Sequence, residues 1–201
     1  QEGFILAVSN DLTIRGSSAR LELGGATLMP RSRGGYLIYS HDMDGSGAYM
    51  FGRCLNSTSS IALTCGGNLV LTNGGVLRIY SGPTNGMPDY GALVDVKGDV
   101  RIYSNSWIFP VSNPTNGGTA LFKMNNLTIP TGNAGFNAIQ SGYSGGGGSR
   151  QNGYGIGGGG SMAGGGYGGV GGNSGGITYG ISNAPIHPGS GGGREGTVTD
   201  N

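Results

Sequence analysis

The chain has 201 residues, of which 47 are glycine, and its formal net charge is +1. Only 10% of its residues are charged, whereas about 25% is typical of soluble globular proteins. So small a net charge excludes electrostatic attraction to nucleic acid or to an anionic membrane surface. No apolar run approaches the ~18 residues of a membrane-spanning helix.

Low charge also favours association between copies of the chain. The sequence begins at Gln1 rather than at methionine, so we expect a processed product or a fragment. Removal of a secretion signal would fit this start, as would trimming of a longer chain.

Short runs with alternating apolar positions recur through the first two thirds of the chain, and no stretch has helical periodicity. Four of these runs align with one another, at residues 4–14, 61–71, 92–102 and 120–129. Each has an alternating apolar strand, a polar turn rich in Asn, Asp or Gly, and a second alternating pair. The inward, core-forming positions that this alignment predicts include Phe4, Leu6, Val8, Leu12, Ile14, Val94, Val96, Val100, Ile102, Phe122, Leu127 and Ile129.

A third short strand follows each aligned run, at residues 19–23, 76–80, 107–111 and 135–139. Three strands per repeat predict one coil of a three-sided parallel β-solenoid, an all-β fold. The spacing leaves room for one further coil at residues 36–51, which gives about five coils. An antiparallel sandwich is the alternative, but it does not predict a turn repeated at constant phase.

The repeat pattern resembles the right-handed parallel β-helix repeats of large exported bacterial surface proteins. The resemblance covers residues 4–138 and rests on the coil periodicity. It implies the fold and does not specify a function. We therefore assign residues 1–138 to a β-solenoid.

One local motif suggests a metal site. In the stretch HDMDGSG, Asp42, Asp44 and Ser46 alternate around a glycine turn, as in the first half of a calcium loop. The position that a bidentate glutamate would occupy holds Phe51 instead. An Asp-Gly turn is therefore the favoured interpretation, and Ca²⁺ is the only cofactor that the sequence suggests.

The two cysteines, Cys54 and Cys65, allow two interpretations. They form a disulfide in an exported protein, or they are buried thiols in a reducing compartment. Cys65 also fits an inward position of the second aligned run, so both alternatives stay open.

Residues 139–194 are glycine-rich, and their tyrosines are regularly spaced. Tyrosines stand at positions 143, 154, 167 and 179, at intervals of 11, 13 and 12 residues. Glycine chains can pack as extended left-handed helices with three residues per turn, provided that no side chain separates them. The tract resembles the polyglycine-helix sandwiches of some phage adhesins and glycine-rich antifreeze proteins. We expect an ordered polyglycine-II-like module with rods of about eight or nine residues, followed by a tail at residues 195–201. A flexible linker is the alternative.

No residue pattern predicts catalysis. Asp11, Asp99 and Asn126 share one turn of successive coils, which is a structural arrangement at solenoid corners. We expect a secreted or cell-surface structural protein whose uncapped solenoid ends join copies head to tail into a filament, fibre or sheath. The alternative is a glycan- or receptor-binding adhesin, and a polysaccharide-active enzyme ranks third. The expected partners are copies of the chain itself and surface glycans, without nucleic acid and without a membrane span.

Overall fold

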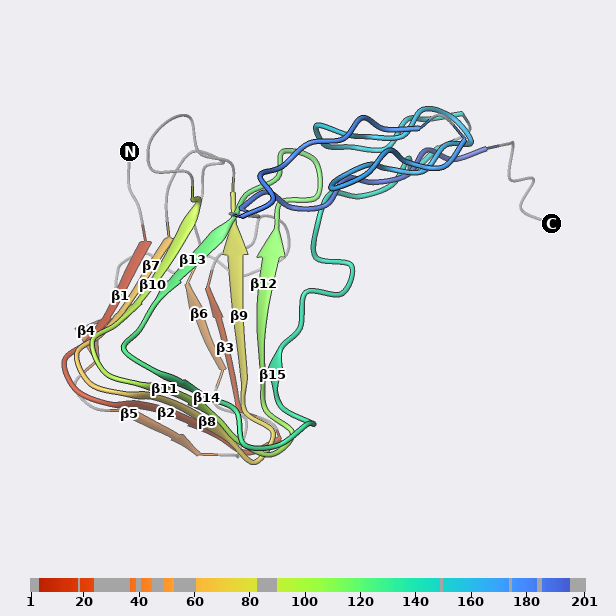
Figure 1. The fold of residues 1–201 in the computed structure, drawn as a ribbon. Helices are drawn as coiled ribbons and strands as arrows, with labels where there is room; N and C mark the ends of the chain where they lie inside the picture. Colours follow the sequence, from red (N-terminus) through yellow and green to blue (C-terminus); the bar gives the residue numbers. More distant parts are fainter. Residues whose placement is uncertain are drawn as a thin grey trace. The chain divides into compact units, whose positions relative to one another are not determined.

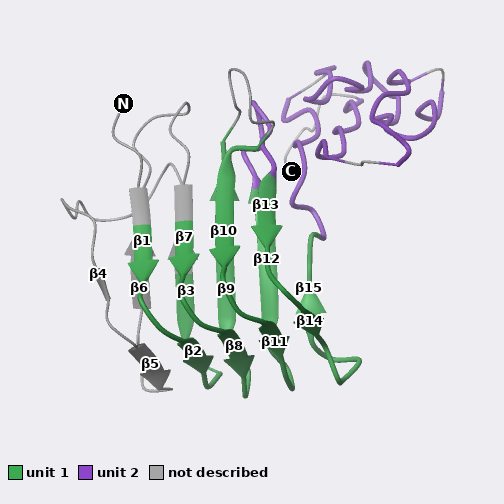
Figure 2. Cartoon of the chain, turned by 60° about the vertical axis from the view of Figure 1, so that its left-hand side comes forward, with its two compact units in different colours: residues 1–111, 120–138 green, residues 112–119, 139–201 purple. Residues whose placement is uncertain are grey.

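The computed structural model describes residues 4–17, 19–23, 37–38, 41–44, 49–52, 61–82, 90–148, 150–173, 175–183 and 186–195. The chain forms two compact units, residues 1–111 with 120–138 and residues 112–119 with 139–201 (Figure 2). The loop at 112–119 differs from our assignment to the solenoid, because it bonds to the glycine-rich segment. The Ser112 N–H donates to the Ser141 carbonyl at 2.8 Å, and the Ser144 N–H donates to the Pro114 carbonyl at 2.8 Å.

The first unit contains three five-stranded sheets (Figure 1). The first sheet has the order β13-β10-β7-β1-β4 and contains β1 (Phe4–Val8), β4 (Leu37–Ile38), β7 (Ile61–Cys65), β10 (Ala92–Val96) and β13 (Ala120–Lys123). The second has the order β14-β11-β8-β2-β5 and contains β2 (Leu12–Arg15), β5 (His41–Asp44), β8 (Leu69–Thr72), β11 (Val100–Ile102) and β14 (Leu127–Thr128). The third has the order β15-β12-β9-β3-β6 and contains β3 (Arg20–Leu23), β6 (Tyr49–Gly52), β9 (Val76–Ser81), β12 (Trp107–Ser112) and β15 (Gly135–Phe136).

Strand pairing is parallel in all three sheets, and successive strands of the chain go to successive sheets. Every three strands therefore make one coil. Coil 1 is β1–β3, coil 2 is β4–β6, coil 3 is β7–β9, coil 4 is β10–β12 and coil 5 is β13–β15. This confirms the prediction of a three-sided parallel β-solenoid.

The coils do not stack in chain order. β1 pairs with β7 on one side and with β4 on the other, and β2 and β3 are likewise flanked by coils 3 and 2. Coil 2 therefore lies outside coil 1, and the stack runs 2-1-3-4-5. The strand at Phe4 is therefore not at an end of the stack, because β4 of coil 2 pairs with its other edge.

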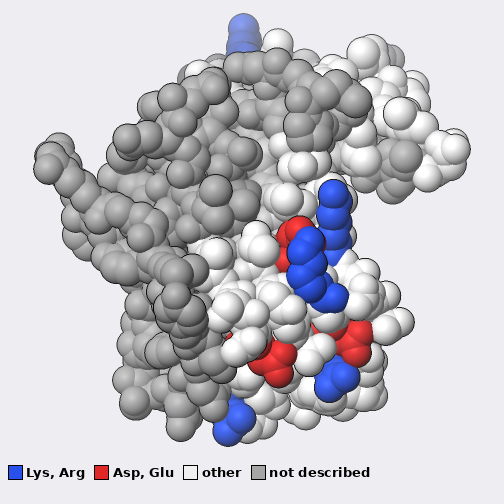
Figure 3. Space-filling view, turned by 90° about the vertical axis from the view of Figure 1, so that its left-hand side faces the viewer, with Lys and Arg blue, Asp and Glu red and all other residues white. Residues whose placement is uncertain are grey.

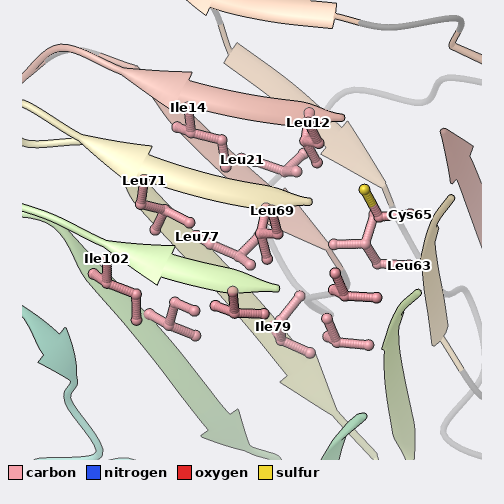
Figure 4. Packing of buried hydrophobic residues seen from close by; sticks show 14 of the residues in the cluster. Leu12, Ile14, Leu21, Leu63, Cys65, Leu69, Leu71, Leu77, Ile79 and Ile102 are labelled. Carbon is pink, nitrogen blue, oxygen red and sulfur yellow. The ribbon is translucent and has the colours of Figure 1, made fainter. Parts of the chain in front are cut away.

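A single apolar column fills the solenoid. Inward residues of neighbouring coils share register positions, so that Ile14, Leu71 and Ile102 stack over one another (Figure 4). The predicted core positions that are buried are Leu6, Val8, Leu12, Ile14, Val94, Val96, Val100 and Ile102. Phe122 is half-buried against this column, and Phe4 lies in β1 with its side chain outside the described residues. The alternation of inward and outward positions, read from the sequence, is what generates this column.

The second unit contains extended passes of glycine-rich chain that run alongside one another (Figure 1). Its backbone bonds repeat every third residue. Tyr143 and Gly146 donate to the carbonyls of Gly189 and Gly192 at 2.9 and 3.0 Å, and both pairs advance by three residues in the same direction. A step of three residues is the repeat of the polyglycine II helix, so this segment is an ordered module rather than a linker.

Other passes bond with the same step. The Gly176 N–H donates to the Gly164 carbonyl at 2.9 Å, and the Tyr179 N–H donates to the Tyr167 carbonyl at 2.7 Å. Residues with positive φ interrupt the tract at several places. These residues are Arg150, Gly155, Met162, Asn173 and Gly180.

Candidate functional site

Coil 5 ends the stack, and its inward residues are exposed on one side. One register column has exposed fractions of 1% at Leu12, 0% at Leu69, 0% at Val100 and 46% at Leu127. Ile129 is 39% exposed. The prediction that Leu127 and Ile129 are core residues was therefore wrong. The reason is that, in the described part of the chain, no further coil lies over them.

The apolar surface of coil 5 consists of the half-buried Phe122 and Met124 and the exposed Leu127, Ile129 and Phe136, and we call it the open end. Phe136 is 37% exposed, and its ring meets that of Phe122 edge to face, with 5.1 Å between centroids. Each strand of coil 5 pairs with coil 4 on one side and is the last strand of its sheet on the other. The open end thus combines apolar side chains with three strand edges that have no partner strand among the described residues. Such edges are a typical surface for strand addition.

A ladder of side-chain hydrogen bonds runs along one corner of the solenoid. We call Asp11, Asn68, Asp99 and Asn126 the turn ladder. Asp11 Oδ1 accepts the Asn68 backbone N–H at 2.6 Å, and Asn68 Oδ1 accepts the Asp99 backbone N–H at 2.9 Å. Each side-chain oxygen thereby satisfies a backbone N–H of the next coil, which fixes the register between coils.

The turn ladder reaches the open end. The Asn126 amide donates to Asp99 Oδ1 at 2.9 Å, and among the described residues no hydrogen bond reaches Asn126 Oδ1. A second corner has the same arrangement, because the Asn133 amide donates to Asn105 Oδ1 at 2.7 Å. The sequence alignment identified Asp11, Asp99 and Asn126 but missed Asn68 and this second pair. The recurrence of Asn one coil apart, at positions 105 and 133, was the available signal.

The carboxylate of Asp99 is held in its ionised form. The hydrogen bond from Asn126 and the hydrogen bond and charge of Arg101 lower the pKa of Asp99 below its ordinary value. Arg101 contacts it at 3.0 Å. A glycosidase general acid needs a raised pKa instead, so the direction of this shift does not suit Asp99 to that one role.

Charges of opposite sign alternate on this part of the surface (Figure 3). Lys97 contacts Asp95 at 2.6 Å, as Arg101 contacts Asp99. Over its described residues, the face shown holds charges of both signs and no single-sign patch.

Cys65 is a free, fully buried thiol. It lies at an inward position of β7, and its Sγ donates to the carbonyls of Asn10 and Asn68 at 3.1 and 3.3 Å. Burial raises the pKa of this thiol, which makes it unreactive at neutral pH. Cys54 lies outside the described residues, so its pairing with Cys65 stays a prediction.

The calcium-like motif falls in a strand. Asp42 and Asp44 belong to β5, which ends at Asp44, and they pair with Thr13 and Arg15 of β2. The Asp-Gly turn that we expected after them lies outside the described residues and stays a prediction. Ser46 lies outside the described residues. Among the residues that the structure describes, no group of three or more His, Cys, Asp and Glu side chains could hold a metal ion.

The reversals of the glycine-rich unit place strained residues on its surface. Arg150, Met162 and Asn173 have φ of 53°, 68° and 56° and are exposed. The left-handed conformation costs a non-glycine residue about 1–2 kcal/mol. Their turns lie together, because the Asn173 amide donates to the Met162 carbonyl at 3.0 Å, and Ser161 donates to the Arg194 carbonyl at 3.4 Å. Arg194 itself donates to the Gly147 carbonyl at 3.2 Å, next to the turn of Arg150.

Tyr167 and Tyr179 take part in the internal packing of the glycine-rich unit. The rings of Tyr167 and Tyr179 meet edge to face at 4.9 Å. Ser190 donates to the Tyr179 hydroxyl at 2.8 Å, and the Gly157 N–H donates to Ser190 Oγ at 3.0 Å. Burial raises the pKa of Tyr179. Two of the four regularly spaced tyrosines therefore connect the passes, whereas Tyr154 is 41% exposed.

Comparison of the chain with protein-family models, with curated proteins and with solved structures found no match. In the described residues, no helix is long and apolar enough to span a membrane. The geometry of the two units is therefore the basis for a functional assignment.

Proposed function

We propose that this chain is a secreted or cell-surface structural protein that assembles head to tail into a filament, fibre or sheath. One observation carries the proposal: the open end exposes Leu127, Ile129 and Phe136 of a column that is otherwise buried. Buried apolar area stabilises by about 25 cal/mol per Å², and a coil stacked on this end would bury all three side chains.

The chain's composition supports the same assignment. A formal net charge of +1 on 201 residues provides little repulsion between copies. A joint between two different ends does not close on itself, so repeated addition produces an open filament. The resemblance of the coil repeat to exported bacterial surface proteins supports a location outside the cell.

Electron microscopy combined with sedimentation velocity over a range of concentrations tests the proposal. We expect filaments of uniform width whose length increases with protein concentration. The Leu127→Lys variant should remain folded and monomeric, because a charge cannot be buried in the joint without a partner. The Ile177→Lys variant is the matched control, because Ile177 is 63% exposed in the glycine-rich unit. A wild-type chain that stays monomeric at all concentrations would refute the proposal.

A second candidate, an adhesin, is favoured by the turns of the glycine-rich unit. Arg150 and Met162 are exposed and have positive φ, a conformation that glycine adopts without strain. These two positions hold larger side chains even though the surrounding segment is rich in glycine. Strain maintained at exposed side chains is typical of recognition sites. Glycan-array binding that is lost in Arg150→Gly and retained in Leu127→Lys would establish this function.

A further inference from the structure

We propose that copies join through one in-register parallel interface, in which β13, β14 and β15 of one copy pair with β4, β5 and β6 of the next. This inference rests on the proposed head-to-tail assembly and specifies its joint. The two ends of the stack are the two outermost strands of each sheet, coil 5 at one end and coil 2 at the other.

Strand direction favours this joint over the alternative. All strand pairs within the sheets are parallel. Translation of a copy along the stack keeps each new pair parallel, as in the four interfaces between coils inside the chain. Two open ends that face each other across a two-fold axis would pair antiparallel, which no sheet of the described solenoid contains.

Apolar residues stand on both sides of the proposed joint. Coil 5 presents the open end. Coil 2 has Ile38, Met43 and Met50 at the register positions of Val8, Ile14 and Leu21, which are core residues of coil 1. Stacking coil 2 of the next copy on coil 5 continues the same column, in which His41 stands at the register position of the core residue Leu12.

The register of the joint follows from the columns inside the chain. Leu127 pairs with Val100, Val100 with Leu69, Leu69 with Leu12, and Leu12 with His41. Continuing this column places Leu127 opposite His41 of the next copy and Thr128 opposite Asp42 of the next copy. Asn126 then lies opposite the residue before β5.

The turn ladder supplies a polar contact that suits any incoming residue. Inside the chain, Asn68 Oδ1 accepts the backbone N–H of Asp99, the residue before β11. At the joint, Asn126 Oδ1 is the matching acceptor that coil 5 presents to the next copy. A backbone donor is present for every residue except proline, so Asn126 sets the register without requiring a particular side chain.

Cysteine cross-linking tests this register. The matched pair Thr128→Cys with Asp42→Cys, in a Cys54→Ser background, places two cysteines on neighbouring strands, about 4.8 Å apart at Cα, which is within disulfide range. The control pair, Thr128→Cys with Asp44→Cys, is shifted by two residues to about 8 Å, which is beyond that range. Oxidation should give a series of covalent dimers and longer species in the matched pair only.

Two results would overturn the inference. Covalent dimers from Thr128→Cys alone would show an open end facing another open end. Filaments that form in both pairs without register-specific cross-linking would show that the joint lies elsewhere, including on the glycine-rich units. The first result would also contradict head-to-tail assembly, whereas the second would leave filament formation in place with a different joint. Absence of any assembly in the parent Cys54→Ser chain refutes the proposed function itself.

Discussion

The Asn126 amide donates to Asp99 Oδ1 at 2.9 Å and so connects coil 5 to coil 4 through a charged acceptor. This bond and Arg101 lower the pKa of Asp99 in the folded chain. The resulting stability is fully present above the ordinary carboxyl pKa of about 3.9 and is lost as pH falls through the lower, folded value.

We therefore expect wild-type chain to lose more stability than Asp99→Asn between about pH 4 and pH 2. Urea unfolding at a series of pH values measures the difference. Equal pH dependence in the two proteins would show that the Asp99 carboxylate does not contribute.

Leu69 and Leu127 share one column but differ in burial, which gives a matched pair of substitutions. Leu69→Ala should lower the free energy of unfolding by about 2–5 kcal/mol, because it leaves a cavity in a packed column. Leu127→Ala should cost clearly less under conditions in which the protein is monomeric, because the side chain is 46% exposed. Equal costs in chemical denaturation would show that Leu127 is covered in solution.

Alanine substitutions at Gly176 and Gly172 test whether the glycines are needed for close packing of the passes. A Cβ at Gly176 would overlap the Gly157 carbonyl of the neighbouring pass, whereas one at Gly172 meets no atom within 4 Å. Gly176→Ala should destabilise the glycine-rich unit by about 1–3 kcal/mol, and Gly172→Ala should not. Amide hydrogen exchange at residues 142–194 measures this, and identical protection in the two variants would contradict the packed-rod structure.

Replacing Met162 by glycine removes strain at an exposed turn. Met162→Gly should raise the thermal stability of the glycine-rich unit, because the left-handed conformation costs a non-glycine residue about 1–2 kcal/mol. Differential scanning calorimetry measures the effect. Gly168→Met is a control for side-chain size, because a Cβ there meets no atom within 4 Å. A loss of stability in Met162→Gly would mean that the methionine side chain supports the turn.

The buried position of Cys65 predicts that its thiol reacts slowly with reagents in solution. In a Cys54→Ser variant, Cys65 should react with a thiol reagent only as fast as the solenoid opens, because its pKa is raised by burial and its Sγ is enclosed. Rapid labelling of the native protein would contradict the core position. Mass spectrometry of the wild-type chain without reductant decides separately whether Cys54 and Cys65 form a disulfide.

The strands of the solenoid could be predicted because their physical cause is local. Alternation at Leu6, Val8, Leu12 and Ile14 defines an inward face that any sheet pairing preserves. The position of coil 2 could not be predicted, because parallel stacking requires matching register and leaves chain order free. The exposure of Leu127 could not be predicted either, since burial depends on whether a neighbouring coil exists.

In the glycine-rich unit, too, some features could be predicted from the sequence and others could not. Tyrosine spacing indicated an ordered repeat, since a flexible linker has no reason to place Tyr143, Tyr154, Tyr167 and Tyr179 at regular intervals. The reversals at Arg150 and Met162 left no such signal, because neither residue type favours a left-handed conformation.

The direct pairing of β1 with β7 makes coil 2 separable from the rest of the column. Residues 24–60 leave coil 1 and return to coil 3 without interrupting the contacts between those coils. A chain in which a short turn replaces this whole segment would still align coils 1, 3, 4 and 5. We therefore expect the segment to behave as an insertion that coils 1, 3, 4 and 5 do not need for their own stacking.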